Sequence, residues 1–537
     1  MAKKNKDQKE NSDLELQTII GNQITNGLGY LGGQLSDQRR KSLEYYLGDK
    51  LGTEIDGRSQ VVSTDVSDTI ESLLPNLLRV FTASDNVVRC EPMTAEDVPM
   101  ADQATAYLNH VFYKENNGFQ LLYNFFKDAL IEKNGFLKIY WDDSEKVDYE
   151  TYENLSPVEK EALQDTKDEI EIVDEEVFED EDAKEQFEAT LAQYEAQGMD
   201  VSQIQVPNFN LYNCKIKRIK KTGKVKIESV PPEEFLIERN AKTIDDADFV
   251  AHKVLMTRSD LVSMGYSQDE VDELPKSDLD IYNNEEIVRM RDIDSYNIST
   301  PTDSSTEKVL IYECYIKYDY DGDGIAELRK VVAAGSDGSH ILSNMPCDNI
   351  PFVTVTPIPM PHRFYGRSIS ELVEDVQLMK STVMRQLLDN MYLTNNNRVA
   401  IMDGMVNMDD LLTTRPGGIV RTKQPPNQVL QPLQAQPISQ QAFPLLSYLD
   451  SVREGRTGVS KEAQGLSPDT LNAKTATGVN ALMTQTQMRS ELIARVFAET
   501  GVKELFKKIF ELMVKYQDKE KIIMMSNQYI PVRPTEW

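Results

Sequence analysis

The stretch "GRSISELVEDVQLMKSTVMRQLLDNMYLTNN", Gly366 to Asn396, decides the fold because it predicts one long, uninterrupted helix. Ser368, with Glu371 three residues later, forms a capping-box pattern at its start. We expect a helix of about 25 residues, roughly 37 Å long and about twice the average globular helix. Its apolar stripe at helical spacing consists of Ile369, Leu372, Val373, Val376, Met379, Val383, Leu387 and Met391.

The chain after this helix alternates compact and helical parts. "RVAIMDGMVNMDDLLTTRPGGIVRTK", from residue 398 to 423, predicts a strand, a short helical turn and a returning strand. A Gln- and Pro-rich connector leads into a second helix from about Ala442 to Arg456. After some twenty aperiodic residues, a last long helix is expected from about Ala476 to Tyr516, bent at Gly501. Two long helices around a compact excursion predict a rod with a tip.

Upstream of the first helix, the pattern is mixed. Residues 34–150 are predicted to be mostly helical, with Pro75 kinking one helix and a strand from Phe136 to Trp141. "CKIKRIKKTGKVKIESV", residues 214–230, predicts a hairpin whose exposed positions carry seven basic residues. These Lys and Arg side chains form either a phosphate-binding patch or an ordinary solvent-exposed face of the hairpin.

Composition restricts the class of protein. A chain of 537 residues is expected to hold two to four domains, and it has no run of apolar residues long enough to span a membrane. The N-terminal lysines are not followed by an apolar stretch, so we expect an intracellular protein without a secretory signal.

The negative charge of the chain is concentrated in one segment. Residues 142–200 hold 23 acidic residues against four lysines, a net charge of −19 out of −30. Such density is typical of a solvated helix or a mobile insertion. Docking of a basic partner is the alternative.

Signatures of catalysis are missing. The four cysteines show no C-x-x-C spacing and the four histidines are scattered, which argues against a disulfide framework or a zinc site. The chain has no phosphate-binding loop, no H-E-x-x-H and no G-x-S-x-G. We therefore predict a protein that is not an enzyme and needs no cofactor.

One acidic loop, "DYDGDGIAEL", resembles the start of a calcium-binding loop. Asp319, Asp321 and Asp323 take its first three ligand positions, but Lys330 stands where the bidentate glutamate is required. Glu327 could replace that ligand only on a different backbone path. Because the flanks alternate like strands, two alternatives remain: a hairpin turn that holds a structural divalent cation and a plain Asp-Gly turn.

The order of these parts resembles the portal, or head-to-tail connector, protein of tailed bacteriophages, most closely the short-tailed branch. The similarity covers about residues 40–537 without the acidic insertion. The stretches that carry it are "GRSQVVSTDVSDTIESLLPNLLRVF", "VPPEEFLIERNAKTIDDADFV", "YDYDGDGIAELRK", "RPGGIVRTK", "GLSPDTLNAKTATGVNALM" and "RSELIARVFAETGVKELFKKIF".

The resemblance implies an α+β portal fold with a mixed α/β wing, a long-helix stem, a small β-containing clip, a tunnel loop and a long wing helix. Portals commonly continue past a motif like "VRPTEW", so we expect a reduced or absent crown. The implied parts are a wing at 1–365 with the acidic insertion 142–200, a stem helix at 366–394, a clip at 395–437, a returning stem helix at 438–456, a tunnel loop at 457–475, a long wing helix at 476–517 and a C-terminal wing segment at 518–537.

The resemblance also implies a function. Portals form rings, usually of twelve subunits, at one capsid vertex, and double-stranded DNA passes through them during packaging and ejection. The implied partners are the terminase, the scaffold, the major capsid protein and the tail adaptors, with no membrane. The protein would be made in the host bacterial cytoplasm and reside in the virion.

Candidate site residues follow from position. Arg456, Lys461 and Lys474 would face DNA at the tunnel loop, where sparse cations suit weak contact. The clip residues expected to dock terminase or adaptors are Arg415, Arg421 and Lys423. Two other classes remain open: a metal-dependent hydrolase that uses Asp319, Asp321, Asp323 and Glu327, and a monomeric acidic adaptor.

Overall fold

The computed structural model divides the chain into two compact units, residues 1–139 with 227–509 and residues 140–226 with 510–537. Helices and strands are mixed, as expected for an α+β fold. The structure describes residues 2–84, 86–143, 145–164, 169–196, 209–221, 223–276, 284–289, 303–396, 398–413, 415–433, 436–459, 488–517, 521–525 and 528–534.

An antiparallel sheet of five strands, in the order β10-β9-β8-β7-β6, forms the centre of the first unit. Its members are β6 (Phe235–Ile237), β7 (Phe249–Thr257), β8 (Lys308–Tyr318), β9 (Glu327–Ala334) and β10 (His340–Pro346). The strands predicted on both sides of the acidic loop are β8 and β9, which pair with Tyr318 opposite Glu327. The flanks of that loop are therefore strands, as expected, and not the helices of an EF-hand.

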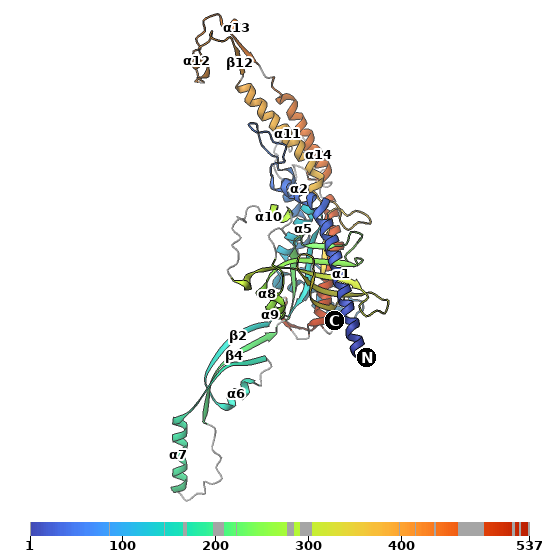
Figure 1. The fold of residues 1–537 in the computed structure, drawn as a ribbon, viewed down its shortest axis with the longest axis vertical. Helices are drawn as coiled ribbons and strands as arrows, with labels where there is room; N and C mark the ends of the chain where they lie inside the picture. Colours follow the sequence, from blue (N-terminus) through green and yellow to red (C-terminus); the bar gives the residue numbers. More distant parts are fainter. Residues whose placement is uncertain are drawn as a thin grey trace. The chain divides into compact units, whose positions relative to one another are not determined.

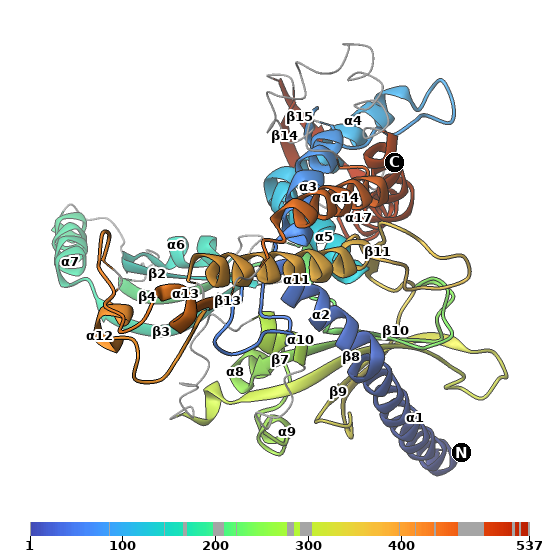
Figure 2. The ribbon, with the colours of Figure 1, turned by 90° about the horizontal axis from the view of Figure 1, so that it is seen from above.

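Helix α1 (Ala2–Tyr30) covers one face of this sheet, as Figure 2 shows. Leu16, Ile20 and Ile24 lie one helical turn apart and are fully buried against residues of β6 to β9. This spacing is typical of a packed helix face, although the charged residues that precede it conceal the signal. The helix was not predicted.

Aromatic side chains fill the other face of the sheet. The rings of Phe136 and Phe235 stack at 4.1 Å between centroids, and Phe352 meets Phe235 edge-on at 5.2 Å. Phe136 and Phe352 come from a second sheet of order β11-β1-β5. Its strands are β1 (Gly135–Asp142), β5 (Lys224–Val230) and β11 (Phe352–Val355).

Helices α2 (Ser36–Leu47), α3 (Asp65–Thr82), α4 (Val98–His110) and α5 (Gly118–Glu132) complete the body of the first unit. Pro75 lies inside α3, which continues through it.

The last long helix contains helical residues 488–497, the π-helical turn η7 (Ala498–Val502) and α17 (Lys503–Tyr516). The irregular turn includes Gly501. The shorter elements are η1 (Leu31–Leu35), η2 (Val111–Glu115), α8 (Arg258–Ser263), α9 (Gln268–Asp272), α10 (Asn284–Arg289) and η6 (Ser304–Thr306).

The predicted pair of long helices is present as α11 (Ser370–Asn395) and α14 (Ser439–Thr457), which lie side by side (Figure 1). The segment between them contains β12 (Arg398–Ile401), α12 (Met408–Leu412), α13 (Pro426–Val429) and β13 (Leu430–Leu433). The expected returning strand at the end of "RPGGIVRTK" is wrong. That stretch makes only an isolated bridge between Val406 and Thr422, and β13 pairs with β12 instead.

The predicted apolar stripe of α11 divides between two environments. Val373, Val376 and Leu387 are buried, whereas Met379 and Met391 are exposed in the single chain by 44% and 49%. The start of the helix keeps half of the predicted capping box, because the Ser368 hydroxyl accepts the Glu371 N–H at 3.2 Å.

The second unit has a three-stranded sheet of β2 (Glu145–Leu155), β3 (Glu169–Glu179) and β4 (Asn210–Lys221) in the order β2-β4-β3. Its helices are α6 (Pro157–Gln164) and α7 (Glu181–Ala196), and β14 (Lys521–Met525) pairs with β15 (Gln528–Val532). The acidic segment is therefore not only helix or mobile insertion, because it supplies both strands that flank β4. The hairpin prediction for residues 214–230 is also wrong, since β4 and β5 belong to different sheets.

Opposite charges explain this pairing. The Lys217 ammonium lies 3.0 Å from the Glu171 carboxylate on β3, and the Arg218 guanidinium lies 3.0 Å from Glu150 on β2. Cross-strand pairs of opposite charge stabilise neighbouring strands. Two of the predicted patch residues are therefore paired with carboxylates of their own sheet.

Candidate functional site

The part of the molecule with the most specific construction is the base of α11. Gln377, Ser381 and Arg385 repeat every four residues on this helix and are all buried. The Gln377 carboxamide accepts the Val66 N–H at 2.8 Å and donates to the Tyr45 carbonyl at 2.9 Å. A buried polar row of this kind is stable only when its partners are in place.

The rest of the row continues along residues 53–63. The Ser381 hydroxyl accepts the Ser63 N–H at 2.9 Å. The Arg385 guanidinium donates to the Val61 carbonyl and the Thr53 hydroxyl, both at 2.9 Å, and to the Glu54 carboxylate at 2.5 Å. Directional bonds to main-chain groups thus fix both the register and the rotation of α11.

Asp65 joins the two long helices to the body. Its carboxylate is 1% exposed and accepts from Lys380 of α11 at 2.7 Å and from Arg453 of α14 at 2.9 Å. Lys380 also donates to Asp450 at 2.8 Å. The network contains two acids and two bases, so its charges balance within a buried site, as such a site requires.

The charge on Lys380 is held by this network. Burial lowers the pKa of Lys380, but the hydrogen bonds to Asp450 and Asp65 outweigh it and carry the pKa above its ordinary value. The ammonium therefore stays protonated across the physiological range. We call Asp65, Lys380, Asp450 and Arg453 the hub.

Arg456, a predicted DNA-facing residue, lies at the end of α14. Its guanidinium donates to the Leu372 carbonyl at 3.0 Å and to the Asp375 carboxylate at 2.5 Å, both on α11. Gly458 ends α14 in the left-handed conformation, with φ of 76°. Lys461 and Lys474 lie outside the described residues.

The three predicted docking cations are all exposed on the segment between α12 and α13. Arg421 makes a two-pronged bond to Asp410, at 2.6 and 3.0 Å, and this bond lowers the pKa of the Asp410 carboxyl. The ion pairs of the described residues include neither Arg415 nor Lys423. Arg415 accepts the Gly418 N–H on its carbonyl in the turn that follows.

Many large apolar side chains of α11, α14 and the segment between them are exposed in the single chain. Exposed apolar surface of this extent is typical of a protein–protein contact. These side chains are Met379, Met391, Tyr392, Leu393, Met402, Met408, Leu412, Ile419, Val420, Leu433, Phe443, Leu445 and Tyr448.

The acidic loop uses its carboxylates to build a turn. Asp319 accepts the N–H groups of Gly322 at 2.7 Å and Gly324 at 2.8 Å, and Asp323 accepts that of Ile325 at 2.7 Å. Oxygens of Asp319, Asp321 and Asp323 lie within 4.8 Å of one another, a group that does not include Glu327. These bonds stabilise the hairpin turn, and this geometry does not favour a hydrolase.

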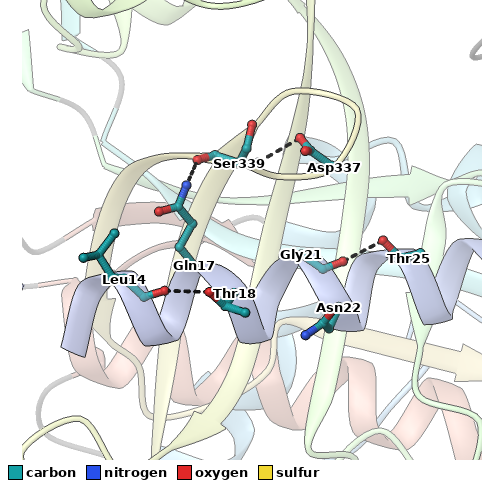
Figure 3. A pocket seen from close by; sticks show the side chains of 8 residues that line it. All are labelled: Leu14, Gln17, Thr18, Gly21, Asn22, Thr25, Asp337 and Ser339. Carbon is teal, nitrogen blue, oxygen red and sulfur yellow. Dashed lines mark hydrogen bonds between the residues drawn. The ribbon is translucent and has the colours of Figure 1, made fainter. Parts of the chain in front are cut away.

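A pocket of about 490 Å³ lies between α1 and the turn before β10 (Figure 3). Gln17 donates to the Ser339 carbonyl across it, and the Ser339 N–H donates to Asp337 at 3.2 Å. Asp337 is the one ionisable group among the eight residues that line it. The lining therefore lacks a nucleophile paired with a base.

Sequence reasoning missed the residues that root α11. The sequence does contain a signal for them, because Gln377, Ser381 and Arg385 follow one another at intervals of one helical turn. Polar residues at this spacing are usually read as a solvated face, and their partners lie more than 300 residues away in the chain.

Comparison with known families completes the identification. None of the described helices is long and apolar enough to cross a membrane. The model of the family described as "Phage SU10 portal protein" matches residues 16–537. This match includes both long helices, the segment between them and the body that holds them, and so the chain belongs to the Phage SU10 portal protein family.

Proposed function

We propose that copies of this chain form a closed ring of twelve at one capsid vertex, and that double-stranded DNA enters and leaves the virion through it. One observation carries the proposal beyond family membership. Two long helices are rooted in a buried hub, and both they and the compact segment between them expose several large apolar side chains. Such a rod, with little of its apolar surface covered, suits lateral packing among copies.

In this proposal the parts of the chain have separate roles. Residues 1–365 form the wing, with the acidic insertion 142–200, and residues 476–517 and 518–537 add a long helix and a terminal segment to it. Residues 366–394 and 438–456 form the stem, residues 395–437 the clip, and residues 457–475 the tunnel loop. The hub lies where stem helices meet the wing.

The clip cations are proposed to dock the terminase and later the tail adaptors. Arg415 and Lys423 are exposed and suited to contact acidic groups of a partner. Arg421 is exposed as well, and its ion pair with Asp410 orients its guanidinium on the clip surface. The scaffold and the major capsid protein are proposed to contact the wing.

The loop cations are proposed to touch DNA weakly. Each phosphate that a lysine neutralises releases counterions and adds affinity, so a conduit needs few cations. Lys461 and Lys474 supply two in the loop, and Arg456 is partly engaged by Asp375 at its entry.

Electron microscopy and native mass of the purified chain test the ring. Closed rings near twelve subunits are expected, either directly or on addition of the scaffold. Particles that stay monomeric under both conditions would contradict the proposal.

Removal of residues 459–475 tests the tunnel loop. Rings should still form, because the hub remains, while DNA packaging or retention is impaired. A variant with Lys461 and Lys474 changed to glutamine tests the charge alone. Unchanged packaging after the deletion would refute the role of the loop.

A further inference from the structure

A buried group of carboxylates lies where α2, α5, α10 and the loop before β6 meet. Glu132, Glu233 and Glu285 are 1%, 3% and 1% exposed, and one oxygen from each lies within 4.8 Å of the others. None of these residues takes part in the hub. We call these three residues the glutamate cluster.

Two guanidinium groups face the cluster. Arg289 of α10 donates to Glu132 at 2.8 Å and to Glu233 at 2.9 and 3.1 Å, and lies 3.5 Å from Asp128. Arg39 of α2 lies 3.9 Å from Glu285. Four carboxylates therefore share two guanidinium groups, which leaves two negative charges in excess.

Two oxygen atoms of the cluster have no donor. Among the described residues, no hydrogen bond reaches Oε2 of Glu132 or Oε2 of Glu285, although both atoms are buried. A buried carboxylate oxygen without a hydrogen-bond donor is costly. The Arg39 guanidinium is the nearest counter-charge of Glu285 Oε2, and at 3.9 Å it makes no hydrogen bond to that atom.

We propose that Glu132, Glu233 and Glu285 bind one hard divalent cation, of the Mg²⁺ or Ca²⁺ class. Carboxylate oxygens are the ligands that these ions prefer, and two positive charges cancel the excess. The ligands come from α5, from the loop before β6 and from α10. The ion therefore fastens α10, which contacts this part of the body through Arg289 and Glu285, to the rest of the first unit.

The neighbouring contacts make this site different from the acidic loop. There, the oxygens of Asp319 and Asp323 already accept main-chain N–H groups and the residues are largely exposed. In the glutamate cluster, Arg289 satisfies one side of Glu132 and leaves the other oxygen open. The unpartnered buried oxygens therefore distinguish the glutamate cluster from the acidic loop.

The test begins with the full chain freed of metal by chelation. MgCl₂, CaCl₂ and MnCl₂ at millimolar concentration are then added separately, and calorimetric titration and the melting temperature are recorded. We expect one ion bound per chain and a melting temperature several degrees higher, as for any ligand that binds only the folded state. No binding at millimolar concentration would overturn the proposal.

Two variants identify the ligands. E132Q combined with E285Q keeps the side-chain shapes and removes the two excess charges, so ion binding should fall at least tenfold while the metal-free protein remains folded. D319N with D321N and D323N is the control and should bind the ion as the parent does.

Loss of binding in the control, or unchanged binding in the Glu132 and Glu285 variant, would overturn the assignment. If the double variant does not fold, E285Q alone is titrated and a tenfold weaker site is expected. Normal affinity in that variant would also overturn the proposal.

Discussion

Gly501 shows how one missing side chain decides a contact. A Cβ atom at this position would lie 2.1 Å from Cγ1 of Val355 and 3.1 Å from the Thr354 carbonyl oxygen, both on β11. The helix therefore lies closer to the strand than it could with any residue other than glycine at position 501. Sequence analysis selected Gly501 as a bend, whereas its main physical role is this close approach.

We predict that Gly501→Ala lowers the free energy of unfolding by about 2 kcal/mol, because the methyl group overpacks the contact. Gly455→Ala is the matched control on α14, where no atom lies within 4 Å of the added methyl. It should raise stability by up to about 1 kcal/mol through helix propensity. Chemical denaturation measures both, and equal effects would contradict the packing argument.

Glu313 determines a response to acid. Burial raises its pKa, but Lys138 and Lys330 outweigh burial and hold the pKa well below the ordinary value of 4.5. The Lys330 ammonium lies 2.7 Å from the carboxylate, and Tyr315 donates to it at 2.6 Å. The folded state therefore binds fewer protons at Glu313 than the unfolded state does.

It follows that the stability from Glu313 is fully present above pH 4.5 and is lost as pH falls below that value. We predict that Glu313→Gln lowers the free energy of unfolding by about 3 kcal/mol at pH 7, since it removes the carboxylate that faces the buried Lys138 ammonium. The difference from the parent should shrink between pH 4.5 and pH 2 in denaturation curves. Glu270→Gln, on an exposed side chain, is the control, and a difference that is constant with pH would contradict this account.

Helix α11 is specified by two faces with different physics. On its buried side, polar side chains make hydrogen bonds to main-chain groups of residues 45–66. Its exposed side carries apolar residues such as Met379 and Met391. An ordinary amphipathic helix buries mainly apolar residues, whereas α11 buries this polar row beside Val373, Val376 and Leu387. Such a helix is stable only when other parts of the protein satisfy its buried polar groups and cover its apolar side chains.

We predict that Asp65→Asn destabilises the base of α11 and α14 by about 3 to 5 kcal/mol, because it leaves Lys380 and Arg453 short of a counter-charge. Asp68→Asn, on the exposed side of the same helix, should cost less than about 1 kcal/mol. Hydrogen exchange along both long helices measures where protection is lost. Equal loss of protection in both variants would show that the hub does not hold the helices.

At the scale of the whole molecule, the exposed apolar side chains of α14 distinguish a lone subunit from an assembled one. Phe443 is 61% exposed and Tyr448 is 65% exposed. If neighbouring copies cover them in the proposed ring, their removal should weaken assembly and leave the fold of the subunit intact.

We predict that Phe443→Ser combined with Tyr448→Ser weakens ring formation at least about tenfold, as expected from the apolar area no longer buried. The melting temperature of the single subunit should change little, and Ser447→Ala should assemble as the parent does. Native mass as a function of protein concentration gives the ring fraction. Normal assembly of the double variant would place the interface elsewhere.

Several of these helices and strands could be predicted from short stretches of sequence alone. The helix that starts near Ser370 has a start signal, a continuous pattern and no breaker, so neighbouring residues alone determine it. The strands beside Asp319 and the helix before Thr457 follow from the same short-range physics.

Only the tertiary structure decided which side chains meet. β4 does not pair with β5, because the acidic strands β2 and β3 offer its bases better partners. Arg385 is buried because Thr53 and Glu54 are folded against it, and Glu132 meets Glu285 only in the folded chain. The sequence by itself determined elements with strong local signals, such as α11, α14, β8 and β9. The hub, the glutamate cluster and the charge-matched sheet depend on long-range contacts and were decided by the fold.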